Sequence, residues 1–128
     1  MYSQKYIEHF SNPKNIGTID NADIVCNVLN TEGGCFDNVD VYVRTENGLI
    51  KDFKYKLKAC SGTITAFSLL SEVVTDRTEA GLDSITFEYL DGLLGKLPEK
   101  KHHSLRLALE AKEKIKEQLK KIIKGETI

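Results

Sequence analysis

The feature that most constrains the fold is a change in the spacing of apolar residues at Cys60. Between residues 39 and 57 apolar side chains alternate with polar ones, as in half-buried β-strands. From residue 61 onwards they recur at intervals of three and four, as in an α-helix. Cys60 is therefore expected where a strand ends and a helix begins, where free N–H groups and the helix dipole favour a thiolate. A thiolate is the form of cysteine that binds metals and attacks sulfur.

Three segments before Cys60 are predicted to form an antiparallel meander. Residues 24–31 are rich in β-forming side chains, and the alternating stretch that follows is divided by Asn47-Gly48, a strong signal for a two-residue hairpin. In a meander, the turn that carries Cys35 and the end of the third strand lie at the same end of the sheet. Connectivity therefore predicts that Cys35 and Cys60 are neighbours in space.

Along the chain, helices are predicted both before and after the three strands. Ser3 can cap a short first helix, and helical spacing extends from Ser61 to about Thr75. Two short helical segments follow within residues 78–94, and a long amphipathic helix runs from about His102 to Lys124. A chain of 128 residues is the length of one core. We therefore predict a single α+β domain over residues 1–128, with a three-stranded antiparallel sheet and helices packed on one face.

Composition argues against several classes of protein. A net charge of −1 gives no sign of a nucleic-acid partner, and no apolar run approaches the length of a membrane span. The first residues lack the apolar region of a signal peptide. Three cysteines are too few, and odd in number, for a disulfide scaffold. We expect a cytoplasmic protein with reduced thiols and no membrane or nucleic-acid partner.

Potential metal ligands gather at three predicted element ends: Cys35 with Asp37, then Cys60, then His102 and His103. Two thiolates, an imidazole and a carboxylate make four ligands, enough for tetrahedral zinc or for the terminal positions of a [2Fe–2S] cluster. Element ends are where functional residues concentrate. No Cys-x-x-Cys pair is present, so the spacing alone is weak evidence for a metal site.

Each candidate also has an ordinary structural interpretation. An isolated aspartate such as Asp37 more often starts a strand or turn, and a histidine at a helix start most often faces solvent. His102 and His103 point about 100° apart on a helix, so we expect at most one to face the cysteines. Cys26 alternates with apolar neighbours on the first strand and is interpreted as a core thiol. Spacing leaves open whether Cys35 is a ligand.

Four motifs together resemble a known family: Cys35-x-Asp37, Cys60-Ser-Gly, Lys101-His102-His103-Ser104, and the opening Tyr2-Ser3-x-Lys5-x-Ile7-x-His9-Phe10-x-Asn12-Pro13-x-Asn15-x-Gly17. Over nearly its whole length the chain resembles the IscU/NifU N-terminal family of iron–sulfur cluster assembly scaffolds. In that family the corresponding motifs are Cys-Gly-Asp, a second cysteine with a small-residue turn, and Lys-x-His-Cys.

The resemblance implies a SufE/NifU-type fold and a scaffold that transiently binds a [2Fe–2S] cluster and transfers it to apo iron–sulfur proteins. It implies Cys35, Asp37, Cys60 and His103 as iron and cluster ligands, a cysteine desulfurase as the source of sulfur, and no catalytic turnover. It also implies a monomer or weak homo-oligomer. The identity of the fourth ligand, whether Asp37, His102 or His103, stays open.

The main departure from the family is Ser104, which stands where the family has its third cysteine. A serine hydroxyl is a poor ligand and cannot carry a persulfide. Sulfur would have to be accepted by Cys35 or Cys60, or arrive by another route. Two other hypotheses follow: a zinc-binding sulfur acceptor that works with a cysteine desulfurase, and a degenerate paralogue that binds partners without a cluster.

A second departure concerns the segment Leu97-Pro98-Glu99-Lys100-Lys101. In the family this segment is Leu-Pro-Pro-Val-Lys and is bound by a dedicated Hsp70-type chaperone. Its middle is charged in this chain, which argues against that partner.

Overall fold

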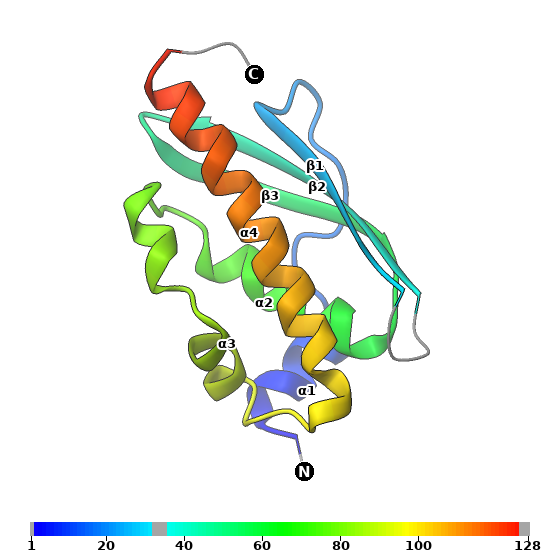
Figure 1. Cartoon of the computed structure of the whole chain (residues 1–128). Coiled ribbons are helices and arrows are strands. Elements are labelled where there is room, and N and C mark those ends of the chain that lie inside the picture. Colours follow the sequence, from blue (N-terminus) through cyan, green and yellow to red (C-terminus); the bar gives the residue numbers. More distant parts are fainter. Residues whose placement is uncertain (1, 32–35, 126–128) are drawn as a thin grey trace.

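The computed structural model describes residues 2–31 and 36–125, and it has an antiparallel sheet in the order β1-β2-β3 with helices on one face (Figure 1). This confirms the predicted α+β architecture. Helical boundaries at Ser61 and His102 agree with the sequence prediction. In chain order the elements are α1 (Gln4–Ser11), β1 (Ile24–Asn30), β2 (Asp37–Glu46), β3 (Leu49–Lys58), α2 (Ser61–Val73), the 3₁₀ turn η1 (Ala80–Ser84), α3 (Phe87–Leu93), the 3₁₀ turn η2 (Glu99–Lys101) and α4 (His102–Ile123).

The sheet register brings three strand ends to one edge. Asn47 and Gly48 have φ of 54° and 77°, the left-handed conformations of a two-residue hairpin turn, so β3 returns alongside β2. Asn30 at the end of β1 pairs with Asp37 at the start of β2. Asn38 in turn pairs with Lys58. The start of β2 therefore lies beside the end of β1 and the segment that leaves β3.

One face of the sheet is the core face. Val39, Val41 and Val43 on β2 are fully buried, while the residues between them are partly or fully exposed. Helices α2 and α4 lie against the buried face and contact β3 and β1 respectively (Figure 1). Across that interface the rings of Tyr55 and Phe67 pack with centroids 6.0 Å apart. None of the helices within residues 2–31 and 36–125 combines the length and the apolar content of a membrane span.

A buried polar network attaches the N-terminal segment to α2. The His9 ring lies with Nδ1 2.6 Å from the Ser68 hydroxyl and Nε2 3.1 Å from a Glu72 carboxylate oxygen. The Lys14 amide also donates to the Ser68 hydroxyl. A carboxylate only accepts, so Nε2–H donates to Glu72, and Nδ1 of the neutral ring accepts from Ser68. The neutral ring thus satisfies both contacts, with Nε2–H donating and Nδ1 accepting.

The protonation of His9 is expected to make the fold acid-sensitive. Burial is the largest influence and lowers the pKa of His9; nearby lysines lower it further, and this outweighs the opposing effect of Glu72 and Glu8. With the native pKa below that of the unfolded chain, stability is full above the unfolded value and is lost as pH falls towards the native pKa. Denaturant unfolding from pH 7.5 to 5 should show this loss. His9→Gln should flatten the dependence, and an unchanged slope would contradict the assignment.

Gly95, which follows α3, should not tolerate a side chain. Its φ is +83°, and a Cβ there would lie 2.7 Å from the Cβ of Ser3, whose hydroxyl caps α1 by accepting from the Tyr6 amide. Left-handed strain and disturbance of that cap should together cost about 2–3 kcal/mol in Gly95→Ala. The control is Gly92→Ala, because no atom lies within 4 Å of a Cβ there. Chemical denaturation should show Gly92→Ala unchanged or slightly stabilised, and equal losses in both variants would contradict the prediction.

Candidate metal centre

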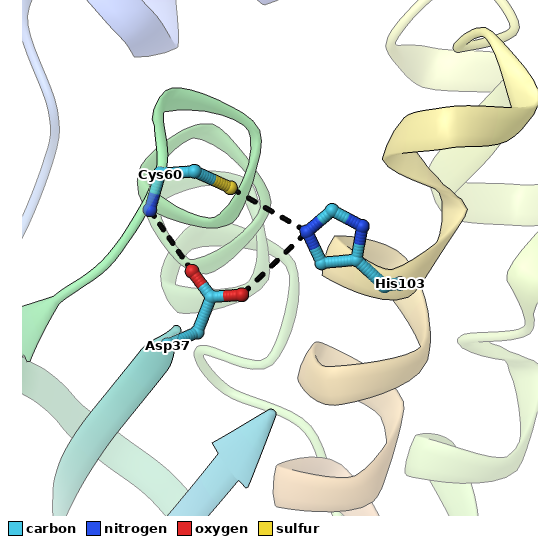
Figure 2. Close-up of side chains that lie close together, drawn as sticks. All are labelled: Asp37, Cys60 and His103. Carbon is cyan, nitrogen blue, oxygen red and sulfur yellow. Dashed lines mark hydrogen bonds and ion pairs between the residues drawn. The ribbon is translucent and has the colours of Figure 1, made fainter. Parts of the chain in front are cut away.

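Asp37, Cys60 and His103 converge at the edge of the sheet where the strand ends meet. Their ligand atoms all lie within 4.8 Å of one another. His103 Nε2 lies 3.5 Å from Cys60 Sγ and 3.5 Å from Asp37 Oδ2 (Figure 2). Asp37 is fully buried and His103 is 7% exposed, while Cys60 is half-buried. Three residues from distant parts of the chain thus form one compact donor set.

Each ligand atom is placed by the end of an element. Asp37 is the first residue of β2, Cys60 is the N-cap of α2, and His103 lies in the first turn of α4. The antiparallel register carries the end of β3 back to the start of β2, so Cys60 arrives beside Asp37. Contact between α2 and α4 then places His103 opposite both. Local periodicity sets each element, and packing of the elements forms the site.

The Asp37 carboxylate is oriented by two hydrogen bonds. The Cys60 amide donates to Oδ1 at 2.9 Å, and the Asn30 side-chain amide donates to Oδ2 at 3.0 Å. Hydrogen bonds of this kind stabilise a buried charge that would otherwise be costly. They also leave Oδ2 facing His103 (Figure 2). Because Asn30 and Asp37 pair across the two strands, the Asn30 side chain holds the carboxylate where it can act as a metal ligand.

The ring of His103 is oriented by a carbonyl. Its Nδ1 lies 3.1 Å from the Lys100 carbonyl oxygen, which can only accept, so Nδ1 carries a hydrogen. In the neutral ring Nε2 therefore presents a lone pair to the Cys60 sulfur and the Asp37 carboxylate. Three electron-rich atoms facing one another need a proton or a metal cation between them. A histidine held by a backbone carbonyl through its other nitrogen is the usual arrangement of a metal ligand.

The two separations from His103 Nε2 fit the ligands of a tetrahedral metal. Bonds of about 2.0–2.3 Å in a tetrahedron place two ligand atoms roughly 3.3–3.7 Å apart. The 3.5 Å separations of His103 Nε2 from Cys60 Sγ and Asp37 Oδ2 lie in that range. Sulfur, nitrogen and oxygen donors together suit zinc or iron. His103 Nε2 can therefore share one metal ion with Cys60 Sγ or with Asp37 Oδ2 at its present separation from each.

The Cys60 thiol is activated by its surroundings. Burial is the largest influence and by itself raises its pKa, but hydrogen bonding by the side chain and backbone of Thr63 opposes this. Hydrogen bonding by Ser104, and by His103 when its ring also carries a hydrogen on Nε2, acts in the same direction as Thr63, and together these groups lower the pKa of Cys60 to about 7. A substantial fraction is therefore thiolate at neutral pH, the form that binds metal and attacks sulfur.

Of the other sequence candidates, His102 and Cys26 lie away from this donor set, and Cys35 is not among the described residues. His102 is directed away from the site: its Nε2 lies 3.0 Å from the Leu97 carbonyl, and its ring packs edge-on against Phe87. Cys26 is half-buried against the core, and burial raises its pKa to about 11, so it is a protonated thiol. Cys35, and with it the predicted proximity of Cys35 to Cys60, lies outside the described residues and stays a prediction.

Sequence reasoning missed three contributors to the site: Asn30, Thr63 and the Lys100 carbonyl. It also treated Ser104 only as a lost ligand. Asn30 becomes predictable once the strand register is known, because it pairs with Asp37. Thr63 had a local signal, since it lies three residues after a helix N-cap, the spacing of a capping interaction. The Lys100 carbonyl had none, because any residue type offers the same group.

Comparison with known proteins identifies the family of this fold and site. The family model described as the NifU-like N terminal domain matches residues 1–124. The chain belongs to this NifU-like family. Among solved structures, the N-terminal part of a NifU-like protein from Brucella abortus matches this NifU-like domain with a TM-score of 0.67. That match covers 93% of this chain and 94% of the other at 19% identity, so it bears on the fold alone.

Curated relatives of this NifU-like domain are named as scaffolds. The protein named iron–sulfur cluster assembly scaffold protein IscU 1 from Archaeoglobus fulgidus is 34% identical over 111 residues, covering 87% of this chain and 71% of the relative. The protein named iron–sulfur cluster assembly scaffold protein IscU from Aquifex aeolicus is 31% identical over 109 residues, covering 85% of this chain and 69% of the relative.

Proposed function

We propose that this protein is an iron–sulfur cluster assembly scaffold that binds a [2Fe–2S] cluster transiently and passes it to apo iron–sulfur proteins. The observation that carries the proposal is the convergence of Asp37, Cys60 and His103 in a chain whose relatives are named as cluster assembly scaffolds. Cys35 would complete a set of four ligands. The cluster is cargo in this scheme, and the protein binds and releases it without catalytic turnover.

The proposed ligands divide into two chemical classes. The thiolates of Cys35 and Cys60 suit one iron, and the harder oxygen and nitrogen donors of Asp37 and His103 suit the other. Mixed ligation of this kind should give a labile cluster, as a donor requires. Sulfur would come from a cysteine desulfurase, whereas the charged centre of residues 97–101 weighs against an Hsp70-type partner. A cytoplasmic location and a monomeric or weakly oligomeric state stay predictions from the sequence.

The test is anaerobic reconstitution with ferrous iron and sulfide, followed by visible absorption and Mössbauer spectra. The wild-type protein should show a [2Fe–2S] spectrum with two distinct iron environments, which Cys60→Ala and Cys35→Ala should each abolish. Cys26→Ala is the matched control, because Cys26 lies away from the site. It is four residues, about 13 Å, along β1 from Asn30, the residue of that strand that contacts Asp37. A cluster spectrum that survives Cys60→Ala would overturn the assignment.

One observation favours a second candidate, a zinc-binding sulfur acceptor for a cysteine desulfurase. His103 Nε2 lies 3.5 Å from both Cys60 Sγ and Asp37 Oδ2, the separation of two ligands around a tetrahedral ion. Tight, stoichiometric zinc binding with no cluster after reconstitution would select this function. Binding to a desulfurase with neither metal nor cluster would instead select a degenerate paralogue.

A further inference from the structure

Two buried hydroxyl groups flank the Cys60 sulfur. Thr63 Oγ1 and Ser104 Oγ lie 2.9 Å apart, and both residues are fully buried. Cys60 Sγ lies 3.5 Å from the Thr63 hydroxyl and 3.8 Å from the Ser104 hydroxyl. Position 104, where the family has a third cysteine, thus supplies one hydroxyl of a pair that flanks the one described site sulfur.

The pair has a hydrogen available for that sulfur. Each hydroxyl carries one hydrogen, and a single hydrogen bond between Thr63 and Ser104 uses only one of the two. The second hydrogen can be donated to Cys60 Sγ or to His103 Nε2, which lies 3.4 Å from the Ser104 oxygen. A hydrogen bond to an anionic sulfur is stronger than one to a neutral acceptor. The pair is therefore a preorganised donor beside a thiolate or a perthiolate.

The backbone of α2 leaves room for this arrangement. A Cβ at Gly62 would lie 2.9 Å from Ser104 Oγ, closer than real Cβ contacts. The absence of a side chain at Gly62 thus lets the start of α4 approach α2 until the two hydroxyls meet. Ser104 therefore packs closely against Gly62 where α4 meets α2.

We propose that the Thr63–Ser104 hydroxyl pair makes Cys60 a site that holds sulfane sulfur as a persulfide. The proposal deepens the proposed scaffold function and rests on it for the supply of sulfur. A persulfide donor R–S–SH, on a protein or a small thiol, brings the sulfur. The Cys60 thiolate attacks the outer sulfur, the new Sγ–S bond forms, the donor S–S bond breaks, and R–S⁻ leaves. The hydroxyl pair donates to the anionic persulfide that remains on Cys60.

A serine at position 104 also prevents a reaction that would remove the outer sulfur of the Cys60 persulfide. A thiol at position 104 could attack Sγ of the persulfide, forming a disulfide between the two positions and releasing the outer sulfur as H₂S. In that reaction the outer sulfur is reduced to sulfide and the sulfur at position 104 is oxidised, while Cys60 Sγ exchanges one S–S bond for another. A serine hydroxyl without an activating base does not attack sulfur in this way. Ser104 therefore both stabilises the persulfide and prevents its intramolecular reduction.

The test uses the full chain with Cys35→Ala, so that a second site thiol does not compete. The protein is loaded with glutathione persulfide without iron, freed of excess donor, and followed by intact-mass and peptide mass spectrometry for a single added sulfur on Cys60. Cys26 in the same molecule is the internal control, because burial raises its pKa to about 11 and a protonated thiol should not take up the sulfur. Ser104→Ala and Thr63→Val each remove one hydroxyl, and Thr63→Ser restores it.

We expect Ser104→Ala and Thr63→Val to shorten the half-life of the Cys60 persulfide by about five- to tenfold, the effect of one hydrogen bond. Thr63→Ser should keep the parental half-life, and Ser104→Cys should convert the persulfide to a disulfide with release of sulfide. Half-lives within about twofold across all four variants would overturn the proposal. Because no iron is present, persistence of the persulfide in a protein that fails to form a cluster would reject the scaffold function alone.

Discussion

His103→Ala is expected to weaken zinc binding by more than about 100-fold, because loss of a supporting group alone costs 10–100-fold and this change removes a ligand. His103 Nε2 lies 3.5 Å from both Cys60 Sγ and Asp37 Oδ2, the separation of ligands sharing one metal. Its removal leaves two described donors and an open cavity at the site. Competition with a chromophoric chelator gives the affinity, and the same variant should lose the cluster spectrum after reconstitution.

The matched control for this prediction is the neighbouring residue. His102→Ala removes an identical ring from the same turn of α4, but that ring contacts the Leu97 carbonyl and Phe87 rather than the site. Zinc affinity should stay within about threefold of wild type, while stability falls because a hydrogen bond and a ring contact are lost. Equal effects of the two substitutions on zinc affinity would show that the metal is not bound by His103.

Ser104→Cys is expected to turn a labile cluster site into a retentive one. The Ser104 oxygen lies 3.8 Å from Cys60 Sγ and 3.4 Å from His103 Nε2, within reach of a shared metal. A thiolate at this position is a softer and stronger iron ligand than a hydroxyl. Stabilisation of the bound cluster by about 1.4 kcal/mol would slow its release tenfold. We expect transfer to an apo-ferredoxin, followed by visible circular dichroism, to slow by at least about tenfold.

Ser104→Ala distinguishes ligation from packing in this experiment. It removes the hydroxyl without adding a ligand, so cluster release should be as fast as in wild type or faster. Thermal unfolding of each variant must accompany the transfer rates, because Ser104 is fully buried and packs close to Gly62. Release from Ser104→Cys at the wild-type rate, in a protein of wild-type stability, would show that position 104 does not reach the metal.

Local sequence patterns predict most of the secondary structure and the strand topology of this protein. Alternation in residues 39–57 and the Asn47-Gly48 turn specified the β2–β3 hairpin, and Ser3 was correctly predicted as the cap of α1. These features are local: side-chain periodicity, turn chemistry and capping act over a few residues. The same local signals placed Cys60 at a strand-to-helix junction, which the structure confirms.

The construction of the site depends on packing between elements that are distant in the sequence. Sequence spacing showed that His102 and His103 face different directions, but the rotation of α4 against α2 and β1 determined that His103 faces Cys60. The pairing of Asn30 with Asp37 depends on the β1–β2 register, and the Thr63–Ser104 contact depends on the close approach of two helices at Gly62. Each of these contacts joins residues whose distance is set by packing of whole elements, and packing depends on the entire buried surface rather than on any local pattern.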